Sequence, residues 1–318
     1  MRAATFSRFG GPEVVTVHEV PTPAPAAGEL LVRVAAASVG SSDAAGRSGE
    51  PKFARLMFGL RGPREKVLGS DFAGTVEAVG EGVTEFAVGD RVFGATGASM
   101  GGHAEFIVVA AAGAVASLPA EVSATQAVAL ADGAMTALPF LRDTGRIRPG
   151  MRVLVNGASG AVGAAGVQLA KHAGAHVTAV TSTPNRELVA GLGADRVIDY
   201  TTTDFTTLPD RFDIVFDAVG LSSFARVRRI LAPEGRYLTT VPGVVLLQAL
   251  VTRRARISFT GLRSDENKRP DLAELALLTA SGVLEPLIDS VYPLDAIGEA
   301  YARVDSGRKR GTVVLAFG

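Results

Sequence analysis

Three glycines follow an apolar run that is typical of a buried β-strand. After RVLVNG, 152–157, the chain continues ASGAVGAAG, so that Gly157, Gly160 and Gly163 have the spacing G-x-x-G-x-x-G. This spacing suits a phosphate-binding turn, because the chain must turn sharply, its backbone must approach a pyrophosphate closely, and the next helix must pack tightly on the sheet. The N-terminal N–H groups of that helix would then face the phosphates, with the hydroxyl of Ser159 as a further donor.

Glycine spacing alone is a weak signal, because a purely structural strand-to-helix turn can have the same glycines. The context favours a dinucleotide site, since the motif follows a strong strand, opens a helix and stands first in a series of alternating strands and helices. We therefore expect a nucleotide cofactor at this turn.

The end of the next strand bears on which cofactor binds. An NAD site usually has Asp or Glu about 20 residues after the glycines, where the carboxylate binds the ribose 2′-OH. Here the strand ends in Thr181, Ser182 and Thr183, followed by Asn185 and Arg186. Hydroxyls and a guanidinium favour a 2′-phosphate, which a carboxylate would repel, so the pattern predicts NADPH rather than NADH. The alternative is that the hydroxyls are helix N-caps and that Arg186 is a solvated residue at a helix start.

Cysteine is absent from the chain, which excludes disulfides, thiolate zinc sites, iron–sulfur clusters and a cysteine nucleophile. The four histidines are spread over the sequence, at His18, His103, His172 and His176. Because zinc needs several such ligands together, we expect no catalytic metal. His103 is interpreted as a turn residue rather than a catalyst.

Two blocks of elements must position these residues. The first 118 residues are β-rich, which is typical of a compact barrel or sandwich, and the strand-like runs are 14–20, 29–39, 74–80, 90–95 and 104–110. After a helix or helix pair capped by Ser123, strands and helices alternate, which predicts a doubly wound parallel sheet. The expected strands are 152–157, 176–182, 196–200, 212–220, 235–241 and 256–262, with helices at 161–173, 185–192 and 222–231.

The composition fits a globular protein of two domains. The 318 residues are enough for two cores, 47% are apolar and 20% charged, and the 32 basic and 32 acidic residues cancel. This balance argues against a nucleic-acid or anionic-membrane surface, so a small molecule is the expected partner. The start MRAATFSRFGGPE lacks an apolar signal core and the apolar runs are too short to span a bilayer, which predicts a cytoplasmic protein.

Seven runs along nearly the whole chain resemble one family. They are FGGPEVVTVHEVPTPAPAAGELLVRVAAASV, VLGSDFAGTVEAVGEGVTEFAVGDRVFG, GGHAEFIVV, GASGAVGAAGVQLAKHAGA, LGADRVIDY, FDIVFDAVG and GVLEPLIDSVYPLDAIGEAYARVDSGRKRGTVVL. In these runs the chain is similar to the zinc-independent, zeta-crystallin-like quinone oxidoreductases of the medium-chain dehydrogenase/reductase superfamily.

The resemblance implies an α/β fold with two domains. A GroES-like β-barrel catalytic domain would occupy residues 1–120 and be completed by 264–318, and a Rossmann domain with a doubly wound parallel sheet would occupy 121–263. The resemblance also implies NADPH as the cofactor and a homodimer joined through the last Rossmann strand.

The resemblance also assigns residues to the cofactor. Those expected to bind the pyrophosphate are Ala158, Ser159, Gly160, Ala161, Val162 and Gly163. Those expected around the adenosine 2′-phosphate are Ser182, Arg186 and Tyr200. Those expected to line the rest of the cofactor are Ala218, Val219, Val241, Pro242, Thr260, Gly261 and Leu262.

Two departures from the superfamily bear on the chemistry. Zinc-dependent relatives have a His-Glu pair where this chain has Ser70-Asp71, which agrees with a reaction without metal. In the loop ASVGSSD, Gly40 replaces the family's asparagine, and no tyrosine occurs before Tyr200. The candidate catalytic donors are then the hydroxyls of Ser41, Ser42 and Thr136, the last of which matches a family threonine near the nicotinamide. Asp43 is interpreted as a loop cap.

The predicted function is NADPH-dependent transfer of a hydride to quinones or other α,β-unsaturated carbonyls, without metal. An enoyl-thioester reductase shares this architecture and is one alternative. A non-catalytic NADPH-binding redox sensor is another, which the missing asparagine and tyrosine favour.

Overall fold

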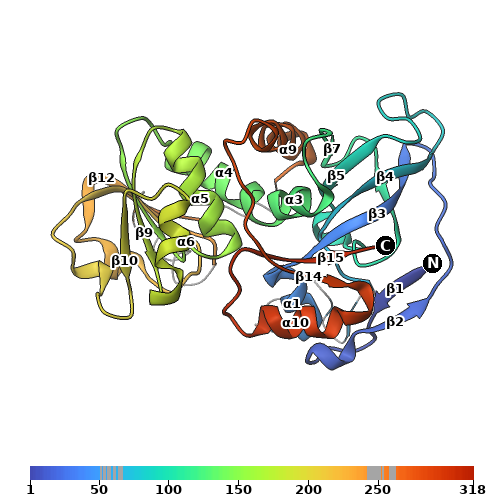
Figure 1. Cartoon of the computed structure of the whole chain (residues 1–318), viewed down its shortest axis with the longest axis horizontal. Helices are drawn as coiled ribbons and strands as arrows, with labels where there is room; N and C mark the ends of the chain where they lie inside the picture. The colour runs from blue at the N-terminus through green and yellow to red at the C-terminus, as the bar shows by residue number, and fades with distance from the viewer. Residues whose placement is uncertain are drawn as a thin grey trace. The chain divides into compact units, whose positions relative to one another are not determined.

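The computed structural model describes residues 1–50, 52, 55, 59, 62–63, 67–241, 252, 254–257 and 263–318. The chain divides into two compact units, whose elements are labelled in Figure 1. Unit 1 comprises 1–132, 261–281 and 287–318, and unit 2 comprises 133–260 and 282–286. The predicted α/β fold class is confirmed, because unit 2 contains a parallel sheet connected by helices. The domain limits at 120 and 263 stay predictions, since these units are defined by packing alone.

Unit 2 is built on a six-stranded parallel sheet. Its strands are β8 (Arg152–Asn156), β9 (His176–Thr181), β10 (Arg196–Asp199), β11 (Phe212–Asp217), β12 (Leu231–Thr239) and β13 (Ala255–Ile257). Their order is β10-β9-β8-β11-β12-β13, which is the 3-2-1-4-5-6 order of dinucleotide-binding domains. The order reverses between β8 and β11, so the carboxyl ends of these strands mark the expected ligand-binding edge.

Helices connect the strands of this sheet (Figure 1). They are α5 (Ala161–His172), α6 (Arg186–Gly191) and α7 (Phe224–Val227), with the short turns η5 (Thr183–Asn185) and η6 (Phe205–Thr207). α5 buries its small and apolar residues against β8 and β9, and α6 packs against β9 and β10. The helix predicted over 222–231 is wrong in length, because α7 has one turn and β12 begins at Leu231, where it pairs with β11.

The segment between residues 124 and 145 is helical throughout. α3 (Ala124–Ala129) and α4 (Met135–Pro139) alternate with two wider, π-helical stretches, η3 (Leu130–Ala134) and η4 (Phe140–Gly145). Ser123 caps the start as predicted, since its hydroxyl accepts the N–H of Gln126 and its own N–H donates to the Gln126 side chain. The helix widens directly after Pro139, which has no N–H to donate to the helical ladder.

Unit 1 contains a mainly antiparallel sheet. Its strands are β3 (Glu29–Val39), β4 (Asp71–Val79), β5 (Arg91–Ala95), β6 (Phe106–Ala110), β7 (Val115–Ser117), β14 (Ile288–Pro293) and β15 (Thr312–Ala316). They run in the order β14-β15-β3-β4-β5-β7, with β6 also paired to β3. β1 (Arg2–Thr5) and β2 (Thr16–Glu19) form a separate antiparallel pair.

Helices α1 (Ser41–Ser48), α9 (Asp265–Ala280) and α10 (Ile297–Asp305) complete unit 1, with short turns η1 (Pro12–Val14), η2 (Gly97–Ser99) and η8 (Leu294–Ala296). One apolar core surrounds Phe72 and Val92, and another packs α10 through Tyr301 against Val39.

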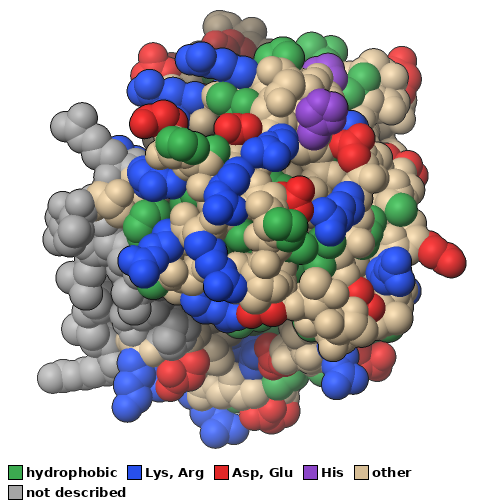
Figure 2. Space-filling view, turned by 90° about the vertical axis from the view of Figure 1, so that its left-hand side faces the viewer, with side chains coloured by type: hydrophobic (Ala, Val, Ile, Leu, Met, Phe, Trp, Pro, Cys, Tyr) green, Lys and Arg blue, Asp and Glu red, His purple; other side chains and the backbone are tan. Residues whose placement is uncertain are grey.

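Among the residues that the structure describes, none of the helices is both long and apolar enough to cross a membrane. On the face drawn in Figure 2, basic side chains are numerous and acidic ones lie among them.

Candidate functional site

The glycine turn after β8 is shaped for the close approach of a ligand. Gly157 has a φ of +79°, which favours glycine, and a Cβ there would lie 2.5 Å from the side chain of Val219. A Cβ on Gly163 would lie 2.1 Å from the carbonyl oxygen of Gly157, so only glycine lets α5 pack this closely on the turn. By contrast, the nearest atom to a Cβ on Gly160 would be 3.5 Å away. The space beside Gly160 is therefore open to a ligand.

The N-terminus of α5 adjoins that space. Gly160 is the N-cap and has no side chain, so the first N–H groups of the helix, those of residues 161–163, lack a side-chain cap. Ala158 is fully buried, whereas Ser159, Ala161 and Val162 are partly exposed. A helix N-terminus of this kind binds phosphate through its N–H groups and its dipole. The turn thus fits the pyrophosphate of a dinucleotide.

Hydroxyl and amide groups gather at the end of β9, in what we call the β9-end cluster, formed by Ser159, Thr181, Ser182 and Asn185. The Thr181 hydroxyl donates to Oγ of Ser159 at 3.1 Å. The Asn185 amide donates to Oγ of Ser159 at 3.1 Å and to Oγ of Ser182 at 3.2 Å. Oδ1 of Asn185 is buried and has no hydrogen-bond partner within the described residues. The structure thus joins two predicted site residues, Ser159 and Ser182, through Asn185.

The carboxylate that an NAD site would have at the end of β9 is absent there, but one lies at the end of β10. Asp199 is the register partner of Thr181, is 7% exposed, and accepts the N–H and the hydroxyl of Thr201 at 2.9 and 2.7 Å. Hydrogen bonds from Thr183 and Thr201, with the charge of Arg186, hold the pKa of Asp199 below its ordinary value. Asp199 is therefore ionised near Arg186. The sequence pattern did not indicate it, because it belongs to the neighbouring strand.

Two other residues expected near a 2′-phosphate, Arg186 and Tyr200, are exposed near these strand ends. Arg186 is the first residue of α6. Tyr200 is 58% exposed, follows β10, and donates its N–H to the carbonyl of Thr181 at 3.0 Å. Both side chains are therefore accessible at the end of the sheet where the β9-end cluster lies.

A buried carboxylate organises the loop at the point where the strand order reverses. Asp217, at the end of β11, is fully buried and accepts the Asn156 amide and the Tyr237 hydroxyl, each at 2.9 Å. It also accepts the N–H groups of Gly220 at 3.0 Å and Ser222 at 2.8 Å. Burial, with the charge of Asp217, raises the pKa of Tyr237, so this hydroxyl stays a donor. These hydrogen bonds to Asp217 fix the backbone of the loop after β11. The residue spacing in the sequence did not indicate this network.

That loop carries Ala218 and Val219 and lies against the glycine turn. Ala218 donates its N–H to the last carbonyl of β8 at 3.1 Å. A Cβ on Gly220 would lie 2.4 Å from the side chain of Val241, so Val241 joins the same group. The structure therefore brings Ala218, Val219 and Val241 together beside the glycine turn. Four other predicted residues lie outside the described ones: Pro242, Thr260, Gly261 and Leu262.

In unit 1, one carboxylate holds the loop that precedes α1, whose exposed first residues are Ser41 and Ser42. Asp43 is fully buried, and its Oδ2 accepts the N–H of Gly40 at 2.8 Å. Its Oδ1 accepts the N–H groups of Gly69 and Ser70 at 3.2 and 3.1 Å, so it joins this loop to the one before β4. The interpretation of Asp43 as a loop cap is confirmed. Thr136 belongs to α4 in unit 2, and its place near the two serines stays a prediction.

Two further titratable groups near this loop are buried. Asp71 accepts the Ser38 hydroxyl at 2.7 Å, and burial, with the charges of Asp132 and Asp43, raises the pKa of Asp71 well above its ordinary value. His103 is fully buried, its Nε2 donates to the carbonyl oxygen of Ser38 at 2.7 Å, and burial lowers its pKa. His103 is thus a neutral imidazole held by the backbone, which agrees with a structural role.

Comparison with known proteins places the chain in a family. Two family models match it, that of the alcohol dehydrogenase GroES-like domain over residues 26–120 and that of a zinc-binding dehydrogenase over residues 192–315. The quinone oxidoreductase of Rattus norvegicus is 30% identical over 329 residues, which cover 99% of this chain and 97% of the relative. The chain belongs to the quinone oxidoreductase family. The predicted family is confirmed.

Two further comparisons agree with this membership. The 2-methylene-furan-3-one reductase of Solanum lycopersicum is 31% identical over 327 residues, which cover 99% of this chain and 79% of the relative. The solved structure of the quinone oxidoreductase from Coxiella burnetii matches with a TM-score of 0.90 at 27% identity and covers 99% of each chain. As a member of this family of the medium-chain dehydrogenase/reductase superfamily, the protein is an oxidoreductase that uses a nicotinamide cofactor and a small-molecule substrate.

One of the matching family models is that of a zinc-binding dehydrogenase, so the described residues of this quinone oxidoreductase family member were compared with the ligands that zinc requires. Within the described ranges, no group of three or more His, Cys, Asp or Glu side chains is arranged to hold a metal ion. His103 donates its Nε2 proton to a backbone carbonyl, and both oxygens of Asp43 accept backbone N–H groups. The described residues therefore offer no ligand set that fits a catalytic zinc.

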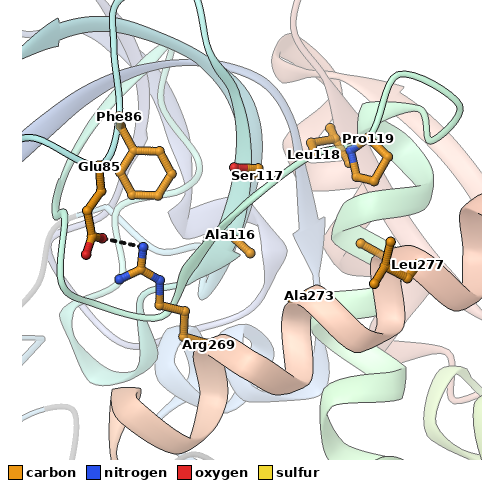
Figure 3. Close-up of a pocket in the computed structure, with 10 residues that line it drawn as sticks. Glu85, Phe86, Ala116, Ser117, Leu118, Pro119, Arg269, Ala273 and Leu277 are labelled. Atoms are coloured by element: carbon orange, nitrogen blue, oxygen red, sulfur yellow. Dashed lines mark hydrogen bonds and ion pairs between the residues drawn. The ribbon is translucent and has the colours of Figure 1, made fainter.

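A groove of about 450 Å³ lies in unit 1 of this family member, between α9 and the segment after β7 (Figure 3). Its lining is largely apolar and includes Leu118 and Leu277. Arg269 lies over the ring of Phe86 at 5.5 Å and forms an ion pair with Glu85. Because the charged groups of the groove neutralise each other, its lining suggests no acid or base for the reaction.

Proposed function

We propose that this protein uses NADPH to reduce quinones or other α,β-unsaturated carbonyls, without a metal ion. The observation that carries the cofactor preference is the β9-end cluster, where hydroxyl and amide groups stand in place of the carboxylate that would bind a ribose 2′-OH. Neutral donors and the guanidinium of Arg186 suit a 2′-phosphate, which a carboxylate at the end of β9 would repel.

Several residues of unit 2 would hold the cofactor, and NADPH bound there would supply the hydride. The N–H groups of residues 161–163 would bind the pyrophosphate at the N-terminus of α5. Asp217 holds the loop after β11 in one conformation, so that Ala218 and Val219 form a fixed wall beside the glycine turn. Because this loop is already ordered, positioning the cofactor would not require a further loss of loop conformational entropy.

In unit 1 the proposed donors to the substrate oxygen are Ser41 and Ser42, together with Thr136 of unit 2. Hydride addition to an enone or quinone leaves negative charge on the carbonyl oxygen, and preorganised donors there stabilise the transition state. Asp43 fixes the backbone before these serines through the N–H of Gly40. The final proton can come from water, because an enolate is basic enough to take it.

The substrate class has support from a relative. The reductase of Solanum lycopersicum is named for 2-methylene-furan-3-one, in which a carbon–carbon double bond is conjugated with a ketone. The quinone oxidoreductases among the relatives are named for a substrate with the same conjugation. A conjugated carbonyl is therefore the substrate class that we propose.

One assay tests the proposal. Purified protein is mixed with NADPH and, separately, with a quinone, an enone, an aldehyde and an enoyl-CoA, while the absorbance of the reduced nicotinamide is followed. We expect turnover with the quinone and the enone only. Turnover confined to enoyl-CoA would indicate an enoyl-thioester reductase, and tight NADPH binding without any turnover would indicate a redox sensor.

The oligomeric state and the location belong to the same proposal. β13 is an edge strand that pairs with β12 alone among the described strands. An exposed edge can pair with a second copy around a twofold axis, so we propose a homodimer joined there. Light scattering should give twice the mass of one chain. A cytoplasmic location is proposed as well, and cell fractionation tests it.

A further inference from the structure

Asn185 links two hydroxyl groups that belong to different segments of unit 2. Ser159 lies in the glycine turn after β8, and Ser182 directly follows β9. The amide of Asn185 donates one N–H to the oxygen of each, at 3.1 and 3.2 Å. Thr181, which is 1% exposed, donates a second hydrogen bond to Ser159. The turn and the strand end are therefore connected through one amide group.

These contacts determine what the two serine hydroxyls can still do. A hydroxyl has one donor and two acceptor positions. Both acceptor positions of Ser159 are filled, by Thr181 and by Asn185, so its O–H is left to donate. Ser182 also accepts from Asn185 and retains its O–H. Two partly exposed hydroxyls whose protons remain available are suited to an anionic oxygen, which accepts several strong hydrogen bonds.

The carbonyl oxygen of the Asn185 side chain also bears on whether the two serine hydroxyls can donate to an anion. Oδ1 is buried and has no hydrogen-bond partner among the residues that the structure describes, which costs free energy. If the amide were turned over, Oδ1 would accept the O–H groups of both serines, and neither serine would remain a donor. The orientation in the structure is thus the one that keeps both donors available. An anion bound to the two hydroxyls would stabilise this orientation against the other.

We propose that Asn185 is a positioning residue that holds the hydroxyls of Ser159 and Ser182 as donors to the 2′-phosphate, and that it thereby sets the preference for NADPH over NADH. This inference rests on the proposed function and deepens it, because it assigns the preference to an amide that acts through its neighbours. A charged 2′-phosphate gains more from two such donors than a neutral ribose hydroxyl does.

A mutant cycle tests whether Asn185 acts through the serines. The dissociation constants of NADPH and NADH are measured for wild type, Asn185→Ala, the double variant Ser159→Ala/Ser182→Ala, and the triple variant. Asn185→Ala should weaken NADPH about tenfold and NADH less than about twofold. In the background without the two serines, Asn185→Ala should cause no further loss. An equal loss in both backgrounds would overturn the positioning role, because the amide would then contact the cofactor itself.

A second variant reverses the donors. In Asn185→Asp the carboxylate would accept both serine O–H groups and add a negative charge, so NADPH should weaken by about 100-fold and NADH far less. The matched control is Asn267→Asp in α9, where Asn267 donates to Oγ of Ser264 at 2.8 Å and the same change in charge should leave both constants unaltered. Thermal unfolding without cofactor shows whether each variant is folded.

The outcomes separate this inference from the proposed function. Equal affinity of the wild type for NADPH and NADH would contradict the proposed function itself. If the wild type prefers NADPH and the preference survives Asn185→Asp in a folded protein, the inference alone is overturned.

Discussion

The β9-end cluster of unit 2 and the loop before α1 in unit 1 use polar side chains in opposite ways. In the β9-end cluster, Ser159 and Ser182 accept hydrogen bonds from Asn185 and keep their own O–H groups. At the loop before α1, both oxygens of Asp43 in α1 accept backbone N–H groups, and His103, which binds the carbonyl of Ser38, is fully buried. The difference teaches that a polar residue at a predicted site is available to a ligand only where the fold leaves a hydrogen-bonding position unfilled.

The largest effect is expected from a substitution in the glycine turn, which lies on the cofactor side of this comparison. In Gly163→Ala the new Cβ would lie 2.1 Å from the carbonyl oxygen of Gly157, so α5 and its N-terminal N–H groups must shift. We expect cofactor affinity to fall at least about 100-fold and the free energy of unfolding to fall by about 2–3 kcal/mol. Fluorescence titration and urea unfolding measure the two losses.

Gly191→Ala in α6 is the matched control for that change. No described atom lies within 4 Å of the Cβ that it would add. It should bind the cofactor normally and gain up to about 1 kcal/mol of stability, because alanine favours a helix. If both alanine variants bound equally well, close packing at Gly163 would not be what shapes the site.

In unit 1, Asp43→Asn tests whether one carboxylate holds two loops. The amide replaces one acceptor by a donor, so it leaves either the N–H of Gly40 or those of Gly69 and Ser70 without a partner. We expect a loss of about 2–3 kcal/mol in the free energy of unfolding, and a lower kcat with an unchanged Kd for NADPH. Asp295→Asn, at an exposed ion pair with Arg2, should cost less than about 1 kcal/mol. A smaller loss for Asp43→Asn than for this control would contradict the role of loop cap.

Substitutions of Asp199 and Arg186 test how the charged groups near the β9-end cluster affect the cofactor. Since Asp199 is ionised, Asp199→Asn should remove a negative charge from the region of the 2′-phosphate and tighten NADPH about threefold to tenfold. Arg186→Ala should weaken NADPH by about tenfold, and neither change should move the NADH constant much. Calorimetry at two salt concentrations should show both effects shrinking at high salt. An equal change for NADH would show that these charges act on the fold rather than on the 2′-phosphate.

Asp71 provides a test by pH. Burial, with the charges of Asp132 and Asp43, raises its pKa, so the folded protein binds this proton more tightly than the unfolded chain. The free energy of unfolding should therefore fall as pH rises from the ordinary carboxyl pKa, about 4, through the raised value. Asp71→Asn cannot ionise and still accepts from Ser38. Above that window it should raise Tm, and at low pH it should have no effect. A Tm difference independent of pH would contradict this explanation.

The smallest effect is expected at the groove in Figure 3. The side chains of Arg269 and Glu85 are 33% and 57% exposed, and an ion pair of this kind contributes about 0–1 kcal/mol. Glu85→Ala should therefore change Tm by less than about 4 °C and leave turnover unaltered. A clear loss of turnover would show that the groove takes part in the reaction, although its lining suggests no acid or base.

The parts of the fold that depend on local sequence were predictable. The strands predicted over 152–157 and 176–182 are observed at 152–156 and 176–181, since apolar runs and glycine spacing specify them. Asp199 was not predictable as part of the site, because only the register of β10 on β9 places it beside Thr181. Asp217 was missed for a similar reason, since its partner Asn156 lies 61 residues away in the sequence. Spacing rules describe neighbours along the chain and do not reach such pairs.

The pairing of β15 with β3 has a consequence for how the protein is made. β15 ends at residue 316 and β3 begins at residue 29, so the sheet of unit 1 cannot be completed until nearly the whole described chain has been synthesised. All six strands of unit 2 leave the ribosome before that, within 152–257. The nucleotide-binding unit can therefore fold first, while β3 still lacks one of its neighbours. A ribosome paused after residue 257 would carry a nascent chain in which the described strands of unit 2 are all present while β3 still lacks β15, and such an unpaired strand edge can pair with other chains.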